Sequence, residues 1–456
     1  MRSPLLALCL ALAALFVCTS LSAQMVEESL AQDPGPLDFI QGDSYEQWIL
    51  QSLAGDALVG ISADGRLVPR LADRWTIRKD GAIHFHLRSD ARFLDGSRVR
   101  AEDVLWTVQQ LLQHPKASPT KRAILEGARV GCDHGSPWIR SPHPPGRLLL
   151  ELARVPIAQQ GHPEGGSGPF VFRKEPGAWV FTRREHFLQP RIDGIRFRLL
   201  PDPAGVMTAL EKGWLSIGAP ATRRQTETPP THRLVTQPMH AQLVVWSRLG
   251  AGPLRLMEHW RRDSFPPHLL GQNACPSRGL WPETLGFRPQ SIGVSTSPAQ
   301  DHGTLRLLYG AGEASLEKLL LALRERARRD GIDLQITPIE QGLLMERLQK
   351  SDFQLACSMV VFDPHPWAVL EYMEPSGPMN FTGWRHPELA DLLSRIQQPG
   401  DSAWGDLQTL WARDPAALPL LDFHSVIWVD KRLVVEPSPM GLYLHTPGAA
   451  GWRWRL

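Results

Sequence analysis

The chain has 456 residues, and this length favours about three domains. Hydrophobic residues make up 43% and charged residues 21%, which excludes a wholly disordered chain, a coiled coil and a collagen-like array. The 49 basic and 47 acidic residues leave a formal net charge of +2, so the composition carries no electrostatic signature of nucleic-acid binding. The 16 tryptophans against 4 tyrosines indicate either an aromatic-lined binding surface or an aromatic-rich core.

The N-terminus has the pattern of a secretory signal peptide. Arg2 supplies a short positive region, an apolar stretch runs from Leu5 to Val17, and small residues follow up to Ala23. The apolar stretch is too short for a membrane span, so the pattern predicts export with cleavage near residue 23. Lipid attachment at Cys18 is the alternative, but Val17 is not the small residue that a lipobox requires before its cysteine.

Removal of this segment leaves Cys132, Cys275 and Cys357. An odd number of cysteines in an oxidising compartment leaves at least one thiol unpaired. Cys275 and Cys357 are expected in the same lobe, so they are the disulfide candidate, with three buried thiols as the open alternative. The chain has no C-x-x-C, so neither a zinc ribbon nor a thioredoxin-type site is indicated.

The first half of the exported chain mixes helices and strands. In chain order, the periodicity predicts a helix over 45–58, strands over 66–68 and 82–87, and a helix over 100–113. The composition then predicts a loop over 132–146, a strand over 148–152, and a Gly-rich crossing between lobes over 159–168. A hairpin over 170–172 and 179–182, a strand over 196–200 and a helix over 204–212 are expected next.

The second half has an α/β pattern. A polar, Pro-rich stretch over 219–238 is consistent with a change of lobe. Strands over 305–309, 332–336 and 353–361 alternate with helices over 315–329 and 341–349. Gly331 occupies the C-cap position of the first of these helices. This alternation with short joints predicts a parallel sheet, to which strands over 418–429 and 433–435 return.

The segment 64–104 is the most specific part of the sequence. It reads DGRLVPRLADRW over 64–75 and DGAIHFHLRSDARFLDGSRVRAEDV over 80–104. Further matches follow in the expected order, namely GSGPF over 166–170, Asp363-Pro364, and Asn380 with Trp384. This ordered set closely resembles the family 5 extracellular solute-binding proteins, the oligopeptide- and dipeptide-binding type of ABC importers.

The resemblance implies a bilobed α/β fold of the type II periplasmic-binding-protein kind, with an additional β-rich subdomain on lobe 1. The implied division is a signal peptide over 1–23, a discontinuous lobe 1 over 24–46, 165–238 and 425–456, a β-rich subdomain over 47–164, and lobe 2 over 239–424. Ligand would bind in the cleft between the lobes, which close over it.

The implied function is capture of a peptide or peptide-like solute in the periplasm and its delivery to an ABC permease in the inner membrane. We expect a monomer with no catalytic residues, no cofactor, no metal site and no nucleic-acid partner. The alternatives are a degenerate binder that acts as a ligand sensor or partner-binding protein, and a binder of a non-peptide solute such as a metal chelate or haem.

Two departures from the family pattern concern the ligand. Peptide binders of this family carry an acidic residue three positions before the Asp-Pro, where it pairs with the peptide's α-amino group, and this chain has Val360 there. Valine cannot stabilise an ammonium, so either a free N-terminus is not recognised or Asp363 takes the role. The second departure is the strand that usually carries Tyr, Phe and Asn just before a Pro-Phe, which here reads VVWSR over 244–248 and is followed by Gly252-Pro253. The helix after it, over 254–262, is weak and shortened, which predicts a trimmed second lobe.

The candidate ligand-binding residues follow the presumed cleft strands, where open α/β sheets place their sites. They are Asp43, Trp246, Ser247, Arg248, Phe362, Asp363, Trp367, Asn380 and Trp384. Arg248 could pair with a ligand carboxylate in a bidentate manner or lie on the solvated surface. The aromatic members could line a pocket or pack in the core.

Two further patterns have simple structural explanations. Ser44, in Gly42-Asp43-Ser44, could be an esterase nucleophile, but no histidine has an Asp three positions before it, so a loop at the cleft edge is favoured. His84 and His86 share a strand face, where a solvated face is favoured over a metal pair.

Overall fold

The structure is a computed structural model. It describes residues 25–42, 44–62, 66–185, 192–219, 228–264, 274–279, 292, 304–311, 314–362, 366–375, 377, 379–396, 401–435 and 451–455. The predicted signal peptide, Cys18, Asp43 and Asp363 lie outside the described residues. Within the described part of the chain, no helix is long and apolar enough to cross a membrane.

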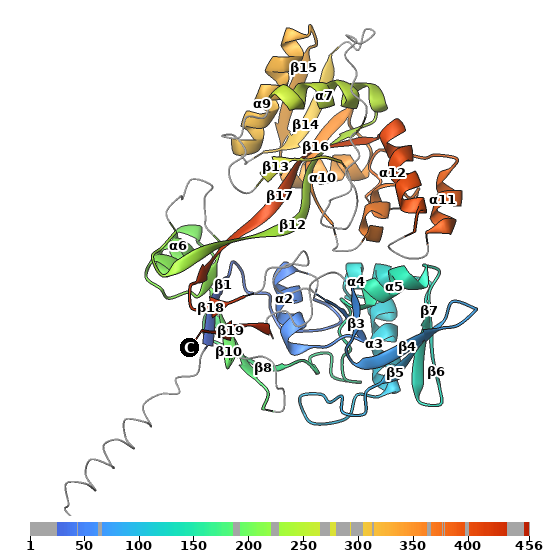
Figure 1. Ribbon diagram of the computed structural model, residues 1–456, viewed down its shortest axis with the longest axis vertical. Helices are drawn as coiled ribbons and strands as arrows, with labels where there is room; N and C mark the ends of the chain where they lie inside the picture. Colours follow the sequence, from blue (N-terminus) through green and yellow to red (C-terminus); the bar gives the residue numbers. More distant parts are fainter. Residues whose placement is uncertain are drawn as a thin grey trace, which may run out of the picture.

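The chain forms an upper and a lower lobe (Figure 1). The lower lobe, lobe 1, contains a four-stranded sheet of order β1-β10-β9-β8. Its strands are β1 (Met25–Leu30), β8 (Phe170–Glu175), β9 (Ala178–Arg183) and β10 (Gly194–Leu199). The antiparallel pairing of β8 and β9 confirms the predicted hairpin. Because β1 pairs with β10, the first described strand is fixed to a segment far along the chain.

A second set of strands and helices lies beside this sheet in the lower lobe (Figure 1). It has a four-stranded sheet of order β4-β5-β7-β6 and a small β2-β3 sheet. The strands are β2 (Val59–Ile61), β3 (Leu67–Pro69), β4 (Ala72–Ile77), β5 (Ile83–Leu87), β6 (Arg129–Asp133) and β7 (Ser136–Arg140). The helices are α2 (Tyr45–Ala54), α3 (Ala101–Gln113), α4 (Pro119–Leu125) and α5 (Pro145–Leu152). Asp103 fixes the start of α3, because its carboxylate accepts from the backbone N–H of Arg100 at 2.8 Å.

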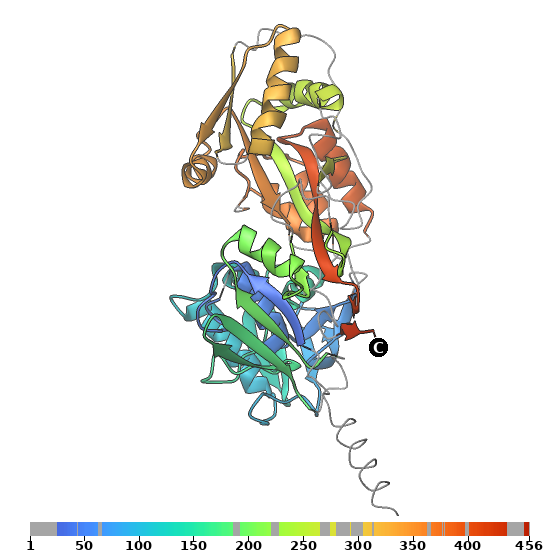
Figure 2. The same cartoon turned by 90° about the vertical axis from the view of Figure 1, so that its left-hand side faces the viewer.

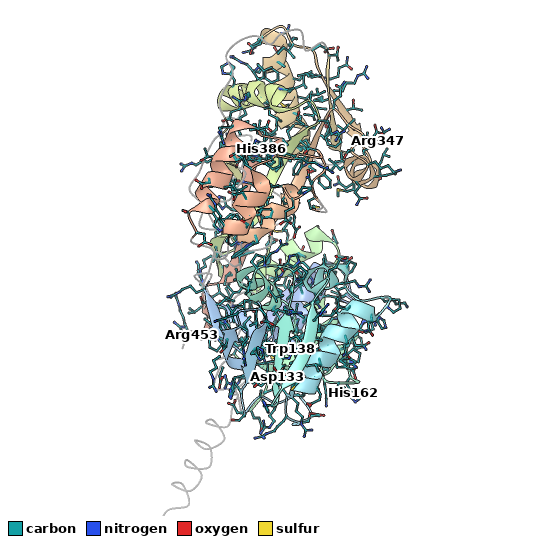
Figure 3. All side chains as sticks on the ribbon, turned by 90° about the vertical axis from the view of Figure 1, so that its right-hand side faces the viewer. Asp133, Trp138, His162, Arg347, His386 and Arg453 are labelled. Atoms are coloured by element: carbon teal, nitrogen blue, oxygen red, sulfur yellow. The ribbon has the colours of Figure 1, made fainter. Side chains whose placement is uncertain are left out.

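Two predictions in this region were wrong. The loop predicted over 132–146 is largely the β6–β7 hairpin, whose turn residues His134 and Gly135 both have positive φ, as a tight two-residue turn requires. Asp133 and Trp138 mark this hairpin in Figure 3. The strand predicted over 148–152 is part of α5, because a short apolar run does not distinguish a buried strand from a buried helix. Pro145 begins the helix, where its missing N–H is not needed.

A sheet of order β11-β17-β12-β16-β14-β15, with β13 paired to β17, forms the framework of lobe 2 and reaches the core of lobe 1 at its β11 end. The strands are β11 (Ile217–Gly218), β12 (His232–Ser247), β13 (Ala274–Pro276), β14 (Leu305–Gly310), β15 (Leu334–Ile339), β16 (Leu355–Val361) and β17 (Ala417–Asp430). The parallel pairing of β14 with both β15 and β16 confirms the predicted parallel sheet. Gly331 has a φ of 77°, as its predicted C-cap position requires.

Helices cover both faces of this sheet. The helical elements are α7 (Ala251–Ser264), α9 (Ala314–Arg329), α10 (Gln341–Gln349), the 3-10 helix η2 (Pro366–Tyr372), α11 (Leu389–Arg395) and α12 (Ala403–Arg413). On β12, Leu243 and Val245 join the core under α7 and α9, while Val244 and Trp246 join the core under η2 and α10–α12. This strict alternation is the period of a strand that is buried on both faces.

The strands β12 and β17 run through both lobes as one antiparallel pair (Figures 1 and 2). At one end, Val235 and Ile427 belong to the core of lobe 1. At the other end, Val245 and Leu418 belong to a core of lobe 2. The register shifts between Pro238 and Gln242, so the ladder is irregular between the lobes. We propose this irregularity as the hinge, beside the proposed boundaries at 238/239 and 424/425.

The predicted Cys275–Cys357 disulfide does not form. Cys275 is on β13 and Cys357 is on β16, and the sheet order places β17 and β12 between them. At about 4.8 Å per strand, three strand spacings give about 14 Å, far beyond the Cα separation that a disulfide spans. Sequence could place both residues in one lobe but could not supply the strand order.

A close approach of lobe-1 backbones generates a stability prediction. A Cβ atom at Gly168 would lie 2.6 Å from the carbonyl oxygen of Leu53, so Gly168→Ala should lower the free energy of unfolding by about 1–3 kcal/mol. A Cβ at Gly405, inside α12, would meet nothing within 4 Å. Gly405→Ala should therefore raise the free energy of unfolding by about 0.5–1 kcal/mol. Urea unfolding of the two variants measures both effects, and equal midpoints would contradict the packing argument.

Candidate functional site

A cluster of aromatic side chains lies on the face of lobe 2 that carries η2. Trp246 stacks on Tyr372 with ring centroids 5.5 Å apart, and Phe381 contacts its edge at 5.3 Å. Phe362 meets Tyr372 edge-on at 5.2 Å. All of these rings are buried. The structure therefore brings the sequence-predicted Trp246 and Phe362 together around Tyr372, a residue that sequence reasoning missed.

Hydrogen bonds hold the predicted residues at the end of β12 and just after it in place. Trp246 donates its Nε1–H to Ser358 Oγ at 2.9 Å. Ser247 donates to the carbonyl oxygen of Gly250 at 2.8 Å, which closes the turn before α7. Arg248 is exposed, and its Nη1 donates to the carbonyl oxygen of Thr382 at 2.8 Å. The role of these residues in ligand binding stays a prediction.

The other predicted aromatic residues lie farther along the same face. Trp367 is 1% exposed and meets Trp404 edge-on at 5.5 Å, and its Nε1 has no hydrogen-bond partner among the described residues. Trp384 donates its Nε1–H to the carbonyl oxygen of Asp414 at 2.9 Å. Asn380 Oδ1 accepts from the backbone N–H of Trp384 at 3.0 Å, so Asn380 organises the loop that carries this tryptophan.

Lobe 1 packs directly against this cluster. Ile61 of β2 and Leu150 of α5 belong to the same buried apolar cluster as Trp246 and Trp367. Burial of apolar area at this contact favours the lobe arrangement seen in the structure. The aromatic face is thus covered, in part, by side chains that belong to the other lobe.

An ion pair joins the lobes beside the aromatic cluster. Arg147 of α5 contacts Glu151 on the same helix at 2.8 Å and Glu374 of lobe 2 at 3.6 Å. Burial raises the pKa of Glu374, and the charge of Arg147 opposes that rise. Burial lowers the pKa of Arg147, but the carboxylates of Glu151 and Glu374 raise it by more, so the pKa lies above its usual value. Sequence reasoning missed this pair, because the i,i+4 spacing of Arg147 and Glu151 has no meaning in a predicted strand.

Val360 lies in the aromatic cluster and is 1% exposed. Directly opposite it on β12 is Gln242, and directly opposite Gln242 on β17 is Asp422. Gln242 Nε2 donates to Asp422 Oδ1 at 2.6 Å. Burial raises the pKa of Asp422, and its hydrogen bonds with Gln242 and Ser277 oppose that rise. The nearest carboxylate along this cross-strand row is therefore two strands away from Val360.

Ser44 has a structural role. Its Oγ accepts from the backbone N–H of Gln47 at 3.1 Å and so caps the N-terminus of α2. The two strand histidines are partnered separately, because His86 contacts Asp73 at 2.9 Å and His84 lies 3.9 Å from Asp133. Among the described residues, no group of three or more metal-ligating side chains is placed to hold a metal ion.

Comparison with known proteins agrees with this architecture. Residues 66–237 match the model of the bacterial extracellular solute-binding proteins, family 5. The resemblance to the family 5 extracellular solute-binding proteins is confirmed.

One sequence relative is the nickel-binding periplasmic protein of Escherichia coli strain K12, which is 24% identical over 226 residues. The alignment covers 43% of this chain and 43% of that protein, so it spans less than half of the relative's length.

Solved structures share the fold over nearly the whole chain. A periplasmic murein tripeptide-binding protein in its unliganded open form has a TM-score of 0.79 at 16% identity, over 95% of this chain and 98% of that one. HbpA2 from Haemophilus parasuis has a TM-score of 0.80 at 16% identity, over 95% of this chain and 100% of that one. The predicted bilobed type II periplasmic-binding-protein fold is thereby confirmed.

The Arg147–Glu374 contact predicts how firmly the two lobes are held together. Glu374→Gln keeps the size of the side chain but removes the charge that faces Arg147, so the lobe arrangement should loosen. Small-angle X-ray scattering should then give a larger radius of gyration than for the unchanged protein. Glu388→Gln is the matched control, because Glu388 contacts Arg413 within lobe 2 at 3.8 Å and is exposed. Superimposable scattering curves for both variants would refute a role for Glu374.

His143, just before α5, predicts a pH dependence of stability. Burial lowers its pKa from 6.5 to about 4, and the nearby charge of Arg147 adds to the shift. Between these values the unfolded chain binds more protons than the folded chain, so the free energy of unfolding should fall as the pH drops from 6.5 to about 4.

Thermal unfolding across this range measures the effect of His143. His143→Gln should flatten the pH slope, whereas the same change at His162, which is exposed on lobe 1 (Figure 3), should leave it unchanged. A slope that is identical in the His143 variant and the unchanged protein would contradict the assignment.

Proposed function

We propose that this protein is an exported solute-binding protein that captures a peptide or peptide-like solute between its lobes and delivers it to an ABC permease. The observation that carries the proposal is the pair of lobes joined by β12 and β17 with the aromatic cluster at their contact. Two lobes on a paired-strand hinge can close over a ligand, and the closed state is populated to the extent that the ligand binds it more tightly. The proposal includes periplasmic location through the segment 1–23, a monomeric state and no catalytic activity.

The named relatives support this class of function. The murein tripeptide-binding protein and the nickel-binding periplasmic protein are both binding proteins of the periplasm by their descriptions. The first supports a peptide-like ligand and the second supports a small non-peptide ligand.

The surroundings of Val360 restrict the ligand. A carboxylate at this position could pair with an α-amino group, but Val360 is packed in an apolar cluster that would make an unpaired ammonium unfavourable. A peptide ligand would then be held through its backbone amides and apolar side chains rather than by its N-terminal charge. The predicted contacts are Asp43, Trp246, Ser247, Arg248, Phe362, Asp363, Trp367, Asn380 and Trp384.

A second candidate function is the binding of a non-peptide solute, such as a metal chelate or haem, or the sensing of a solute without transport. Val360 favours the first version, because it removes the one charge by which peptide binders hold an N-terminus. The sensor version rests on the departures of lobe 2 from the family sequence pattern.

Calorimetric titration tests the proposal with tripeptides, their N-acetylated forms, nickel chelates and haem. We expect a tripeptide and its N-acetylated form to bind within about threefold of each other, because Val360 cannot distinguish an ammonium from an amide. A ligand at 100 times its Kd should stabilise the fold by about 2.7 kcal/mol, which thermal unfolding detects. Binding of only the chelates or haem would select the second candidate, and no binding by any member of the panel would refute solute capture.

A further inference from the structure

A cysteine and a histidine meet beside the proposed hinge. Cys275 is on β13 and His424 is on β17, the strand to which β13 is paired. The Sγ atom of Cys275 lies 3.5 Å from Nε2 of His424, which is within hydrogen-bond reach for sulfur. Both side chains are partly exposed. A reagent in solution can therefore approach the pair.

The strand register places polar groups around this pair. Cys275 is directly opposite Asp422, and His424 is two residues beyond Asp422 on β17, so all three side chains project from the same face of the sheet. Burial raises the pKa of Asp422, and the charge of His424 opposes that rise. From α7, the charge of Arg261 also acts on Asp422.

The same face contains an acceptor that lacks a donor. Gln242 is fully buried, and its Nε2 donates to Asp422 Oδ1 at 2.6 Å and to Ser277 Oγ at 3.2 Å, which fixes its amide within this polar group. Its Oε1 atom has no hydrogen-bond partner among the described residues. The described residues therefore leave the polar group beside Cys275 incompletely satisfied.

We propose that Cys275 and His424 form a thiol-modification site that takes a low-molecular-weight peptidic disulfide, such as oxidised glutathione. His424 accepts the proton of the Cys275 thiol and leaves a thiolate–imidazolium pair. The thiolate attacks one sulfur of the disulfide, a new S–S bond to Cys275 forms, and the original S–S bond breaks. The departing thiolate takes the proton from His424, so the disulfide is reduced to one free thiol as Cys275 becomes a mixed disulfide.

The other two described cysteines provide internal comparisons. Cys132, on the β6–β7 hairpin, is exposed, so access alone favours its reaction over that of Cys275. Cys357 is 0% exposed and lies three strand spacings from Cys275, so it can neither react readily nor resolve the mixed disulfide. Faster reaction at Cys275 than at Cys132 would therefore be due to His424 and not to exposure of the thiol.

The experiment treats the folded protein with oxidised glutathione at pH 6.5, where an ordinary thiol is only about 1% ionised. Peptide mapping by mass spectrometry follows the adduct at each cysteine with time. We expect Cys275 to react at least about tenfold faster than Cys132. In His424→Gln the rate at Cys275 should fall at least about tenfold while the rate at Cys132 stays the same.

The comparison of Cys275 with Cys132 in the unchanged protein needs no variant, so the test survives a failure of His424→Gln to fold. Reaction at Cys275 that is no faster than at Cys132 would overturn the proposal. A folded His424→Gln protein with an unchanged rate at Cys275 would also overturn it. The readout is the covalent adduct at Cys275, so its failure is distinguishable from a failure of the calorimetric titration that tests solute capture.

Discussion

The continuous antiparallel pairing of β12 with β17 is the constraint on which the rest of the molecule depends. Both strands supply apolar side chains to the core of lobe 1 at one end and to cores of lobe 2 at the other. Each lobe can form its core only if the two strands keep this register. The proposed hinge lies where the ladder is irregular, between Pro238 and Gln242.

This constraint sets what lies at the contact between the lobes. The alternation of β12 turns Val244 and Trp246 toward the aromatic cluster, and Ile61 and Leu150 of lobe 1 complete that cluster. Arg147 then lies close enough to contact Glu374 from the opposite lobe. Apolar burial and one charge pair therefore act together across the interface, and both would change when a solute separates or closes the lobes.

The same register gathers the polar side chains near the hinge into one row. Val360, Gln242, Asp422 and Cys275 are successive cross-strand neighbours on β16, β12, β17 and β13. The apolar end of this row belongs to the proposed ligand site and the polar end holds the Cys275–His424 pair. A change at the thiol would thus occur three strand spacings from Val360 along this row.

The sequence by itself determined several local elements and the family resemblance. The helix ending before Gly331 and the parallel strands of lobe 2 follow from periodicity, and the resemblance follows from motifs such as the segment 64–104. The tertiary structure decided which distant residues meet. It made the apolar run 148–152 a helix, brought Arg147 to Glu374, and paired Cys275 with His424 instead of Cys357. Periodicity reports the geometry of one segment, whereas such contacts depend on strand order and register, which packing of the whole chain sets.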